Sequence, residues 1–364
     1  MTENRGYKIE LDVSNRHTEQ LLRKTVGAYR YTFNWALGIV SEKNEQYKED
    51  PSVVRPSYKS LAKEWADTKP EWAWETEAKS QQHAIKDVFT ALKNMKQGNG
   101  YPNFKKKWDK KAAYLTNQSL KVLDSRHIRL SKVGVIRTKE KIPTNLSIRY
   151  ATLTWYAGKW WISLCIEKDI TKSYEKDEVL GIDLGIKHIM TCSDGSVCDL
   201  PASIKKLHLK ERRQQKALAR SQSNTANYIK KLNKLQKTRL KMNNIKLDVV
   251  HKFTSRKCKQ YKTIVIESLN IQDMKESSIK PIRRIYNDSS CMSLAQNCIK
   301  YKAFQLVEAP QEFPSTKRCS HCGHIKDIMQ LSERVYKCEH CGATLDRDIN
   351  AALNLSYTPW VNRD

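Results

Sequence analysis

The stretch from Arg318 to Asn354 reads RCSHCGHIKDIMQLSERVYKCEHCGATLDRDINAALN and combines two kinds of chemistry. Its two CxxC pairs are separated by 15 residues, a spacing typical of a zinc ribbon. Four thiolates fill a tetrahedral shell and leave no position for an activated water, so we expect one structural zinc ion. The predicted ligands are Cys319, Cys322, Cys338 and Cys341.

An acidic turn follows the second cysteine pair almost at once. Asp346 and Asp348 stand at the start of INAALNL, a segment whose composition predicts a helix. An aspartate at this position is often only a helix cap. A functional interpretation therefore needs further carboxylates elsewhere in the chain.

Two such carboxylates end segments that are predicted to be buried strands. Asp183 interrupts the apolar run VLGIDLGI, and Glu267 follows TIVI. A charged carboxylate in such a setting is costly unless a cation compensates it. Magnesium prefers oxygen ligands, and a third carboxylate, from Asp346 or Asp348, would complete a two-metal site for phosphodiester hydrolysis.

The charge of the chain indicates its partner. The 364 residues include 66 Lys or Arg against 39 Asp or Glu, a formal net charge of +27. Such an excess predicts a polyanionic partner, most simply nucleic acid. The apolar content of 39% is sufficient for a folded core.

The same sequence argues against a membrane or secreted protein. No apolar run approaches the length of a membrane span, and the opening MTENRGYKIEL lacks the apolar core of a secretory signal. The six cysteines outside the ribbon lack ligand spacing, which favours a reducing compartment. We therefore expect a cytoplasmic protein without a membrane partner.

The hydrophobic pattern changes several times along the chain. Residues 7–11 alternate like a strand, and helical stripes follow, one from about Thr18 and one from Ile85 to Met95. Residues 113–167 read as strands, with a hairpin turn at Ala157 and Gly158. One economical account is a small β-barrel formed by both strand regions, with the helices inserted between them. Residues 201–260 carry 18 basic and 2 acidic residues and predict two helices that are divided by SQSNTAN.

A basic run with interleaved aromatic residues, YPNFKKKWDKK, precedes the second strand region. A charge run is often only a solvated face, but Phe104 and Trp108 would allow stacking on bases. The predicted phosphate contacts are Lys105, Lys106, Lys107, Lys110 and Lys111.

Taken together, these motifs resemble the TnpB proteins of insertion sequences. GIDLGIKHI, IVIESLN and the cysteine segment with DRDINAALN occur in the family's order, and TVGAYRYTFNWAL and YPNFKKK extend the resemblance to the front half. The resemblance implies a catalytic triad of Asp183, Glu267 and Asp348 that holds two Mg²⁺ ions. Asp348 is preferred over Asp346 because the family pattern places the ligand two residues before Asn350.

The implied fold class is α+β multidomain, with an RNase H-like (RuvC) nuclease domain, an inserted zinc ribbon, and an N-terminal wedge β-barrel with an inserted helical recognition domain. The implied domains are the wedge at 1–14 and 101–177, the recognition domain at 15–100, the nuclease at 178–314 with a basic helical lid at 201–258, the ribbon at 315–343, and the second nuclease part and tail at 344–364.

The implied function is RNA-guided DNA cleavage by a transposon-encoded endonuclease. Its partners would be a guide RNA (omega RNA from the transposon end) and a double-stranded DNA target next to a short recognition motif. Three alternatives remain open: a nuclease-inactive RNA-guided repressor, a compact type V CRISPR effector, and a DNA-strand transferase of the RNase H class.

Overall fold

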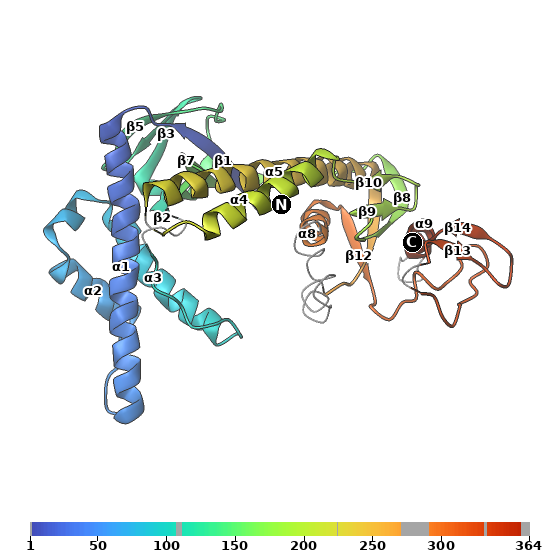
Figure 1. Ribbon diagram of the computed structural model, residues 1–364, viewed down its shortest axis with the longest axis horizontal. Coiled ribbons are helices and arrows are strands. Elements are labelled where there is room, and N and C mark those ends of the chain that lie inside the picture. Colours follow the sequence, from blue (N-terminus) through green and yellow to red (C-terminus); the bar gives the residue numbers. More distant parts are fainter. Residues whose placement is uncertain (1, 107–110, 224, 271–290, 331–332, 358–364) are drawn as a thin grey trace. The chain divides into compact units, whose positions relative to one another are not determined.

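The computed structural model describes residues 2–106, 111–223, 225–270, 291–330 and 333–357 (Figure 1). The chain divides into two compact units. Unit 1 comprises Met1–Ile170 and Ser221–Gln236, and unit 2 comprises Thr171–Arg220 and Lys237–Asp364. None of the described helices is long and apolar enough to cross a membrane.

Unit 1 contains a long helix that packs beside shorter ones (Figure 1). Asn15 begins the long helix, because its side chain accepts a hydrogen bond from the backbone N–H of His17. The predicted apolar stripe from Leu22 to Val40 is buried and forms the helix's core face. The two short helices between residues 58 and 75 are additions to the sequence prediction. The helical elements are α1 (Arg16–Glu49), α2 (Tyr58–Thr68), η1 (Glu71–Glu75) and α3 (Ala78–Met95).

Seven antiparallel strands form the sheet of unit 1, in the order β2-β6-β7-β1-β5-β4-β3. The first strand of the chain lies between β7 and β5, so both predicted strand regions belong to one sheet. Its edge strands β2 and β3 are joined by the short η2 (Asn117–Ser119). Closure of this sheet into a barrel stays a prediction. The strands are β1 (Thr2–Asp12), β2 (Lys111–Thr116), β3 (Leu120–Asp124), β4 (His127–Leu130), β5 (Gly134–Thr138), β6 (Ser147–Tyr156) and β7 (Lys159–Asp169).

The predicted hairpin turn between β6 and β7 is confirmed. Ala157 and Gly158 have φ of 58° and 77°, so both central residues are left-handed. This is the requirement of the tight turn that matches the twist of two antiparallel strands. The turn fixes the register in which Trp155 lies opposite Trp160.

Unit 2 contains a five-stranded mixed sheet in the order β10-β9-β8-β11-β12. The central strand β8 is parallel to β11, which in turn is parallel to β12, whereas β9 and β10 are antiparallel additions. The two predicted basic helices are present as α4 and α5. The elements are β8 (Lys176–Asp183), β9 (Met190–Cys192), β10 (Val197–Cys198), α4 (Ser203–Ala219), α5 (Ala226–Gln260, which begins in unit 1), β11 (Tyr261–Glu267), α8 (Met292–Lys302) and β12 (Gln305–Ala309).

The C-terminal part of unit 2 is a small hairpin followed at once by a helix. Strands β13 (Val335–Lys337) and β14 (Thr344–Asp346) pair in antiparallel register, and α9 (Arg347–Ser356) begins at the next residue. Helix α9 packs on β8, β9 and β11 of the sheet. The cysteine segment is therefore joined to the sheet through α9.

Candidate functional site

Two of the predicted carboxylates lie at the ends of adjacent parallel strands. Ile182 of β8 is paired with Ile266 of β11, so Asp183 and Glu267 occupy the next positions on neighbouring strands. Adjacent strands are separated by about 4.8 Å, and residues in register point to the same face. The apolar residues before each carboxylate are buried, and they fix both strands in the core of unit 2.

The third carboxylate comes from the first turn of α9. Asp346 is the N-cap, and its Oδ1 accepts hydrogen bonds from the backbone N–H groups of Asp348 and Ile349 at 2.9 and 3.3 Å. The capping role expected for Asp346 is therefore confirmed. Although burial raises its pKa, these hydrogen bonds and the nearby Lys187 ammonium hold it below the usual value. Capping fixes the helix start that carries Asp348.

A glycine allows the strand and the helix to approach closely. A Cβ added at Gly181, two residues before Asp183, would collide with the carbonyl oxygen of Ala352 and would lie 2.6 Å from the backbone nitrogen of Ser356. Both contacts are with the backbone of α9, which cannot turn aside as a flexible side chain can. The absence of a side chain at Gly181 thus sets the distance between β8 and α9.

The pKa of Asp183 reflects both its burial and the two other carboxylates. Partial burial raises the pKa of Asp183 to about 7, and repulsion from Asp348 and then Glu267 adds to this shift. The guanidinium of Arg347 acts in the opposite direction but does not offset them. Burial also raises the pKa of Glu267. Asp183 and Glu267 are therefore neighbours at the ends of adjacent strands, and Asp348 is near enough to Asp183 to raise its pKa. That the three form one catalytic site stays a prediction.

The four predicted zinc ligands converge tightly. Their sulfur atoms all lie within 4.8 Å of one another, and among the described residues they are the one His, Cys, Asp or Glu set that is gathered in this way. The Sγ atoms of Cys319 and Cys341 are 3.7 Å apart, and those of Cys322 and Cys338 are 3.6 Å apart. Tetrahedral zinc with Zn–S bonds of about 2.3 Å requires sulfur separations of about 3.8 Å.

Each cysteine pair is held in a tight turn. Gly323 and Gly342 follow the second cysteine of each pair and have positive φ of 77° and 72°. The backbone N–H of Cys341 points at the sulfur of Cys338 at 3.5 Å, and this hydrogen bond helps lower the pKa of Cys338 to about 6. A thiolate is the form that binds a metal. His321, His324 and His340 are exposed, as expected for residues outside the ligand set.

Two buried asparagines of α9 bind the backbone around the first cysteine. Asn350 donates to the carbonyl oxygen of Arg318 and accepts from the N–H of Ser320, at 2.7 and 3.0 Å. Asn354 donates to the carbonyl oxygens of Ser315 and Arg318, at 2.8 and 2.6 Å. The helix that carries Asp348 is thereby hydrogen-bonded to the start of the cysteine segment. The end of that segment leads into the same helix through β14.

The predicted basic run lies only partly within the described residues. Lys107 and Lys110 lie outside them, and only the backbone of Lys111 is described, in β2. Lys106 is exposed, whereas Lys105 is partly buried, with its ammonium 3.9 Å from the ring centroid of Phe33. Contact of these lysines with phosphates stays a prediction.

Sequence reasoning did not single out Gly181 or Asn354 for the site. A glycine inside an otherwise apolar strand is a signal of close backbone approach. The pattern NAALN places two asparagines four residues apart, hence on one face of a helix that also buries alanines. Both signals are present in the sequence. The backbone segment that each one contacts, however, can be identified only from the structure.

Family profiles match three parts of the chain. A profile described as "Probable transposase" matches residues 163–278, one described as "Cas12f1-like, TNB domain" matches 293–355, and one described as "Helix-turn-helix domain" matches 1–50. The first and second together contain all three carboxylates and all four cysteines of the clusters. The third covers the range that the structure folds into β1 and α1.

Individual relatives cover most or part of the chain. The "Putative RNA-guided DNA endonuclease InsQ" of Escherichia coli (strain K12) is 27% identical over 354 residues, which is 92% of this chain and 87% of the relative. The "TnpB-like protein L79" of Acanthamoeba polyphaga mimivirus is 31% identical over 144 residues, 37% of this chain and 27% of the relative. A solved Cas12f1-sgRNA-target DNA complex contains a chain with a similar fold, with a TM-score of 0.58, 14% identity, and coverage of 98% of this chain and 99% of that chain.

Proposed function

The chain belongs to the TnpB family, and on this premise we propose that it is a transposon-encoded, RNA-guided DNA endonuclease. The observation that carries the proposal is the convergence of Asp183, Glu267 and Asp348 from three separate elements, with the pKa of Asp183 raised to about 7. Carboxylates gathered in a partly buried site without a structural ion-pair role are typical of a catalytic metal centre.

The carboxylates suit magnesium. Their ligand atoms are oxygens, and the repulsion of Asp183 by Asp348 and Glu267 is the kind that a divalent cation relieves. Two magnesium ions held there would supply an activated water and stabilise the leaving oxygen of a phosphodiester. The chain's own contribution is to fix the ligands: β8 and β11 place Asp183 and Glu267 side by side, and the capped start of α9 places Asp348.

The cysteine cluster suits a structural zinc ion. Its sulfur separations agree with tetrahedral coordination, and all four positions are taken by protein ligands. We assign it no chemical step. Its contribution is mechanical, since the segment it folds continues directly through β14 into α9.

The fold supports the further assignment of domains. Within unit 2, a mixed sheet with carboxylates at the ends of parallel strands supports a RuvC-like nuclease domain of 178–314 and 344–364, interrupted by the ribbon at 315–343. In unit 1, one antiparallel sheet built from residues 2–12 and 111–169 supports a wedge domain, with the helices of 16–95 as an inserted recognition domain.

The partners follow from charge and family. A net charge of +27 and the exposed lysines and arginines of α4 and α5 support binding of a guide RNA and of the DNA that it pairs with. Base pairing would then supply most of the sequence specificity, and the protein would read a short motif beside the target.

The test has two stages. The protein is purified with RNA co-expressed from the region flanking its gene, and that RNA is sequenced. A plasmid library with a randomised flank of the target is then incubated with the complex and Mg²⁺, and cleaved ends are sequenced. We expect guide-dependent cuts next to one enriched motif, and we expect Asp183→Ala to bind the RNA but not to cut. Cutting by that variant would refute the site, and the absence of any bound RNA would refute guided recognition.

A further inference from the structure

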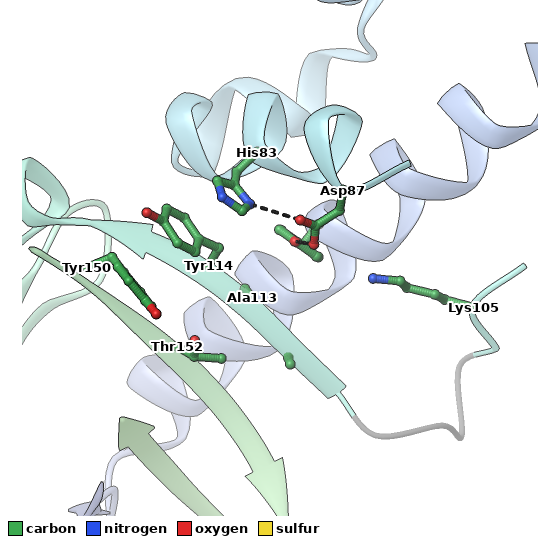
Figure 2. Close-up of a pocket in the computed structure, with 9 residues that line it drawn as sticks. His83, Asp87, Lys105, Ala113, Tyr114, Tyr150 and Thr152 are labelled. Atoms are coloured by element: carbon green, nitrogen blue, oxygen red, sulfur yellow. Dashed lines mark hydrogen bonds and ion pairs between the residues drawn. The ribbon is translucent and has the colours of Figure 1, made fainter. Parts of the chain in front are cut away.

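Unit 1 contains a cavity of about 500 Å³ between α3 and the sheet, and Lys105 is part of its lining (Figure 2). The ammonium of Lys105 lies 3.9 Å from the ring centroid of Phe33 and 5.0 Å from that of Tyr29. The carboxylate of Asp87 in the same cavity accepts a hydrogen bond from the hydroxyl of Tyr29 and lies 3.4 Å from Nδ1 of His83. These charged groups are directed at neighbouring side chains of unit 1, and we assign the cavity no ligand.

A different lysine lies beside the acids of unit 2. Lys187 comes four residues after Asp183, in the loop between β8 and β9, and its Nζ is 3.5 Å from Oδ2 of Asp346. Asp346 caps the start of α9 through its other oxygen, and it is close enough to Asp183 to contribute to the raised pKa of that residue. The ammonium of Lys187 therefore lies at the edge of the proposed metal site.

The loop that carries Lys187 is fixed on both sides of that residue. A Cβ added at Gly185 would lie 3.0 Å from the carbonyl oxygen of His188, so the loop turns tightly before Lys187. Nδ1 of His188 lies 2.9 Å from both carboxylate oxygens of Asp199, and the following Ile189 is buried. The backbone at Lys187 is thus held in place, whereas its side chain is exposed.

The ion pair between Lys187 and Asp346 is open to solvent, with 43% and 37% of the two side chains exposed. An ion pair of this kind contributes only about 0–1 kcal/mol to stability, because water screens the two charges. An ammonium has three N–H donors and no fixed bonding direction. Lys187 can therefore exchange one anionic partner for another at little cost.

A DNA strand at the proposed metal site brings phosphates close to several carboxylates. Each phosphate is negatively charged, so the acids repel the strand unless cations offset them. The guanidinium of Arg347 and the ammonium of Lys187 are cations that lie close to these acids. Nη1 of Arg347 donates to the carbonyl oxygens of Gln330 and Glu333, at 3.1 and 3.4 Å, so this group is directed at the backbone of the cysteine segment. Lys187 instead faces a carboxylate and solvent, and it is the cation that is able to turn toward a strand.

We propose that Lys187 is a substrate-binding residue of the nuclease site, whose ammonium binds a non-bridging oxygen of a phosphate next to the scissile bond. This proposal rests on the proposed function, because that function brings a DNA strand to the acids. The ammonium exchanges Asp346 for the phosphate as the strand arrives, and Asp346 keeps its cap on α9 through Oδ1. The contact is with the phosphate and not with a base, because an ammonium is a compact point charge.

The test combines a change in the protein with a change in the DNA. Target DNA is prepared with one phosphate at a time around the cut replaced by a neutral methylphosphonate, and single-turnover cleavage by the guide-bound protein is measured in Mg²⁺. We expect Lys187→Gln to cut unmodified DNA about tenfold more slowly than the wild type does, the size expected for one charge-assisted hydrogen bond. At the position that Lys187 contacts, the methylphosphonate should slow the wild type by a similar factor and should slow Lys187→Gln no further.

Matched variants separate the charge of Lys187 from its effect on folding. Lys187→Arg keeps the charge and should retain most of the cutting and the sensitivity to the methylphosphonate. Lys176→Gln removes an exposed lysine from the opposite end of β8 and should behave as the wild type does. Thermal melting reports folding, and Lys187→Met replaces Lys187→Gln if the latter melts at a lower temperature.

The salt dependence of binding supplies a readout that does not involve cutting. The dissociation constant of a single-stranded DNA target is measured at several KCl concentrations, with Ca²⁺ in place of Mg²⁺ to prevent cleavage. Loss of one phosphate contact should reduce the slope of log Kd against log[KCl] by about 0.7 in Lys187→Gln. Lys176→Gln should keep the slope of the wild type.

The outcomes separate this proposal from the proposed function. If the wild type cuts, but each methylphosphonate slows Lys187→Gln as much as it slows the wild type, Lys187 contacts no phosphate near the cut and the proposal is overturned. An unchanged salt slope in Lys187→Gln overturns it as well. Absence of guided cutting by the wild type would instead refute the nuclease assignment, and the salt slope would still decide whether Lys187 contacts DNA.

Discussion

The cysteine cluster and the carboxylate cluster meet in one segment, residues 318–354, but they are built in different ways. All four cysteines come from a single stretch between residues 319 and 341, folded by two glycine turns. The carboxylates come from residues 183, 267 and 348, on two strands and a helix. Local sequence therefore specifies the first cluster, whereas the second exists only when the sheet and α9 have packed.

The clusters also differ in their energetics. The sulfur atoms converge at 3.6 to 3.7 Å, a spacing that suits one tetrahedral ion. The carboxylates are less tightly gathered, and the pKa of Asp183 is raised first by burial and then by repulsion from Asp348 and Glu267. The locally folded cysteine segment thus leads directly into the helix that carries Asp348. We expect the two clusters to respond in opposite ways to substitution: loss of stability for the cysteines, and loss of activity for the acids.

Removal of one acid should have the largest effect, a loss of activity without a loss of stability. Glu267→Gln keeps the shape of the side chain but removes the charge needed to bind a metal, so we expect guided DNA cleavage to fall by at least about a thousandfold. The measurement is single-turnover cleavage in Mg²⁺ with the guide RNA bound. Glu178→Gln, an exposed glutamate of β8, is the control and should retain full activity. Retained cutting by Glu267→Gln would refute the assignment of activity to the acids and of stability to the cysteines.

Removal of one thiolate should act on folding. Cys338→Ser leaves three ligands, so we expect loss of the bound zinc and destabilisation of the C-terminal part of unit 2 by several kcal/mol, on the order expected for a structural zinc site. Zinc content per chain by mass spectrometry and thermal melting measure this. Cys165→Ser, outside the cluster, should change the zinc content and the melting temperature only slightly. A variant that still holds one zinc per chain at normal stability would contradict the assignment.

A methyl group between β8 and α9 should reduce both stability and cleavage. Gly181→Ala forces the backbone of α9 away from the strand that carries Asp183, which we expect to cost roughly 2–4 kcal/mol of unfolding free energy and also to reduce cleavage. Urea denaturation and the cleavage assay report both. Gly38→Ala in α1, where a Cβ meets nothing within 4 Å, should be neutral or slightly stabilising.

The smallest expected effect is a dependence of stability on pH. The folded protein keeps the proton of Asp183 up to a pKa of about 7, against 3.8 for the ordinary side chain. Between these values the folded state binds more protons than the unfolded state, so raising the pH lowers the free energy of unfolding. In magnesium-free buffer we expect Asp183→Asn to be more stable than the wild type by roughly 1–3 kcal/mol at pH 7.5, and by less at pH 5.

Chemical denaturation at both pH values checks this prediction. Millimolar Mg²⁺ should raise the stability of the wild type but not that of Asp183→Asn. Parallel pH profiles of the two proteins would show that the pKa of Asp183 is not raised in the folded state and would remove the energetic contrast between the clusters.

The sequence predicted the features that depend on local patterns. The cysteine ligands, the hairpin at Ala157 and Gly158, and the apolar face of α1 each follow from spacing within a few residues. The candidate acids could be named because a carboxylate beside buried strands is costly. Their convergence, however, depends on strand register and on the packing at Gly181, which no local window contains.

The features that the sequence missed depend on distant partners. Lys105 reads as one member of a solvated basic run, but the structure places it beside rings of α1 that lie some 70 residues earlier in the chain. The cavity near it needs residues from α1, α3, β2 and β6 together. Helix α2 was missed because it is short, and its clearest signal is the capping box of Ser57 and Ser60.

The raised pKa of Asp183 also has an evolutionary consequence. Most substitutions reduce stability, so a gene that drifts toward a new role usually loses folding first. Replacing Asp183 by a neutral residue should remove the free-energy cost of a buried charge near two other carboxylates in the metal-free protein. The same substitution should abolish cutting. A lineage released from selection for cleavage can therefore become a guided binding protein without loss of foldability.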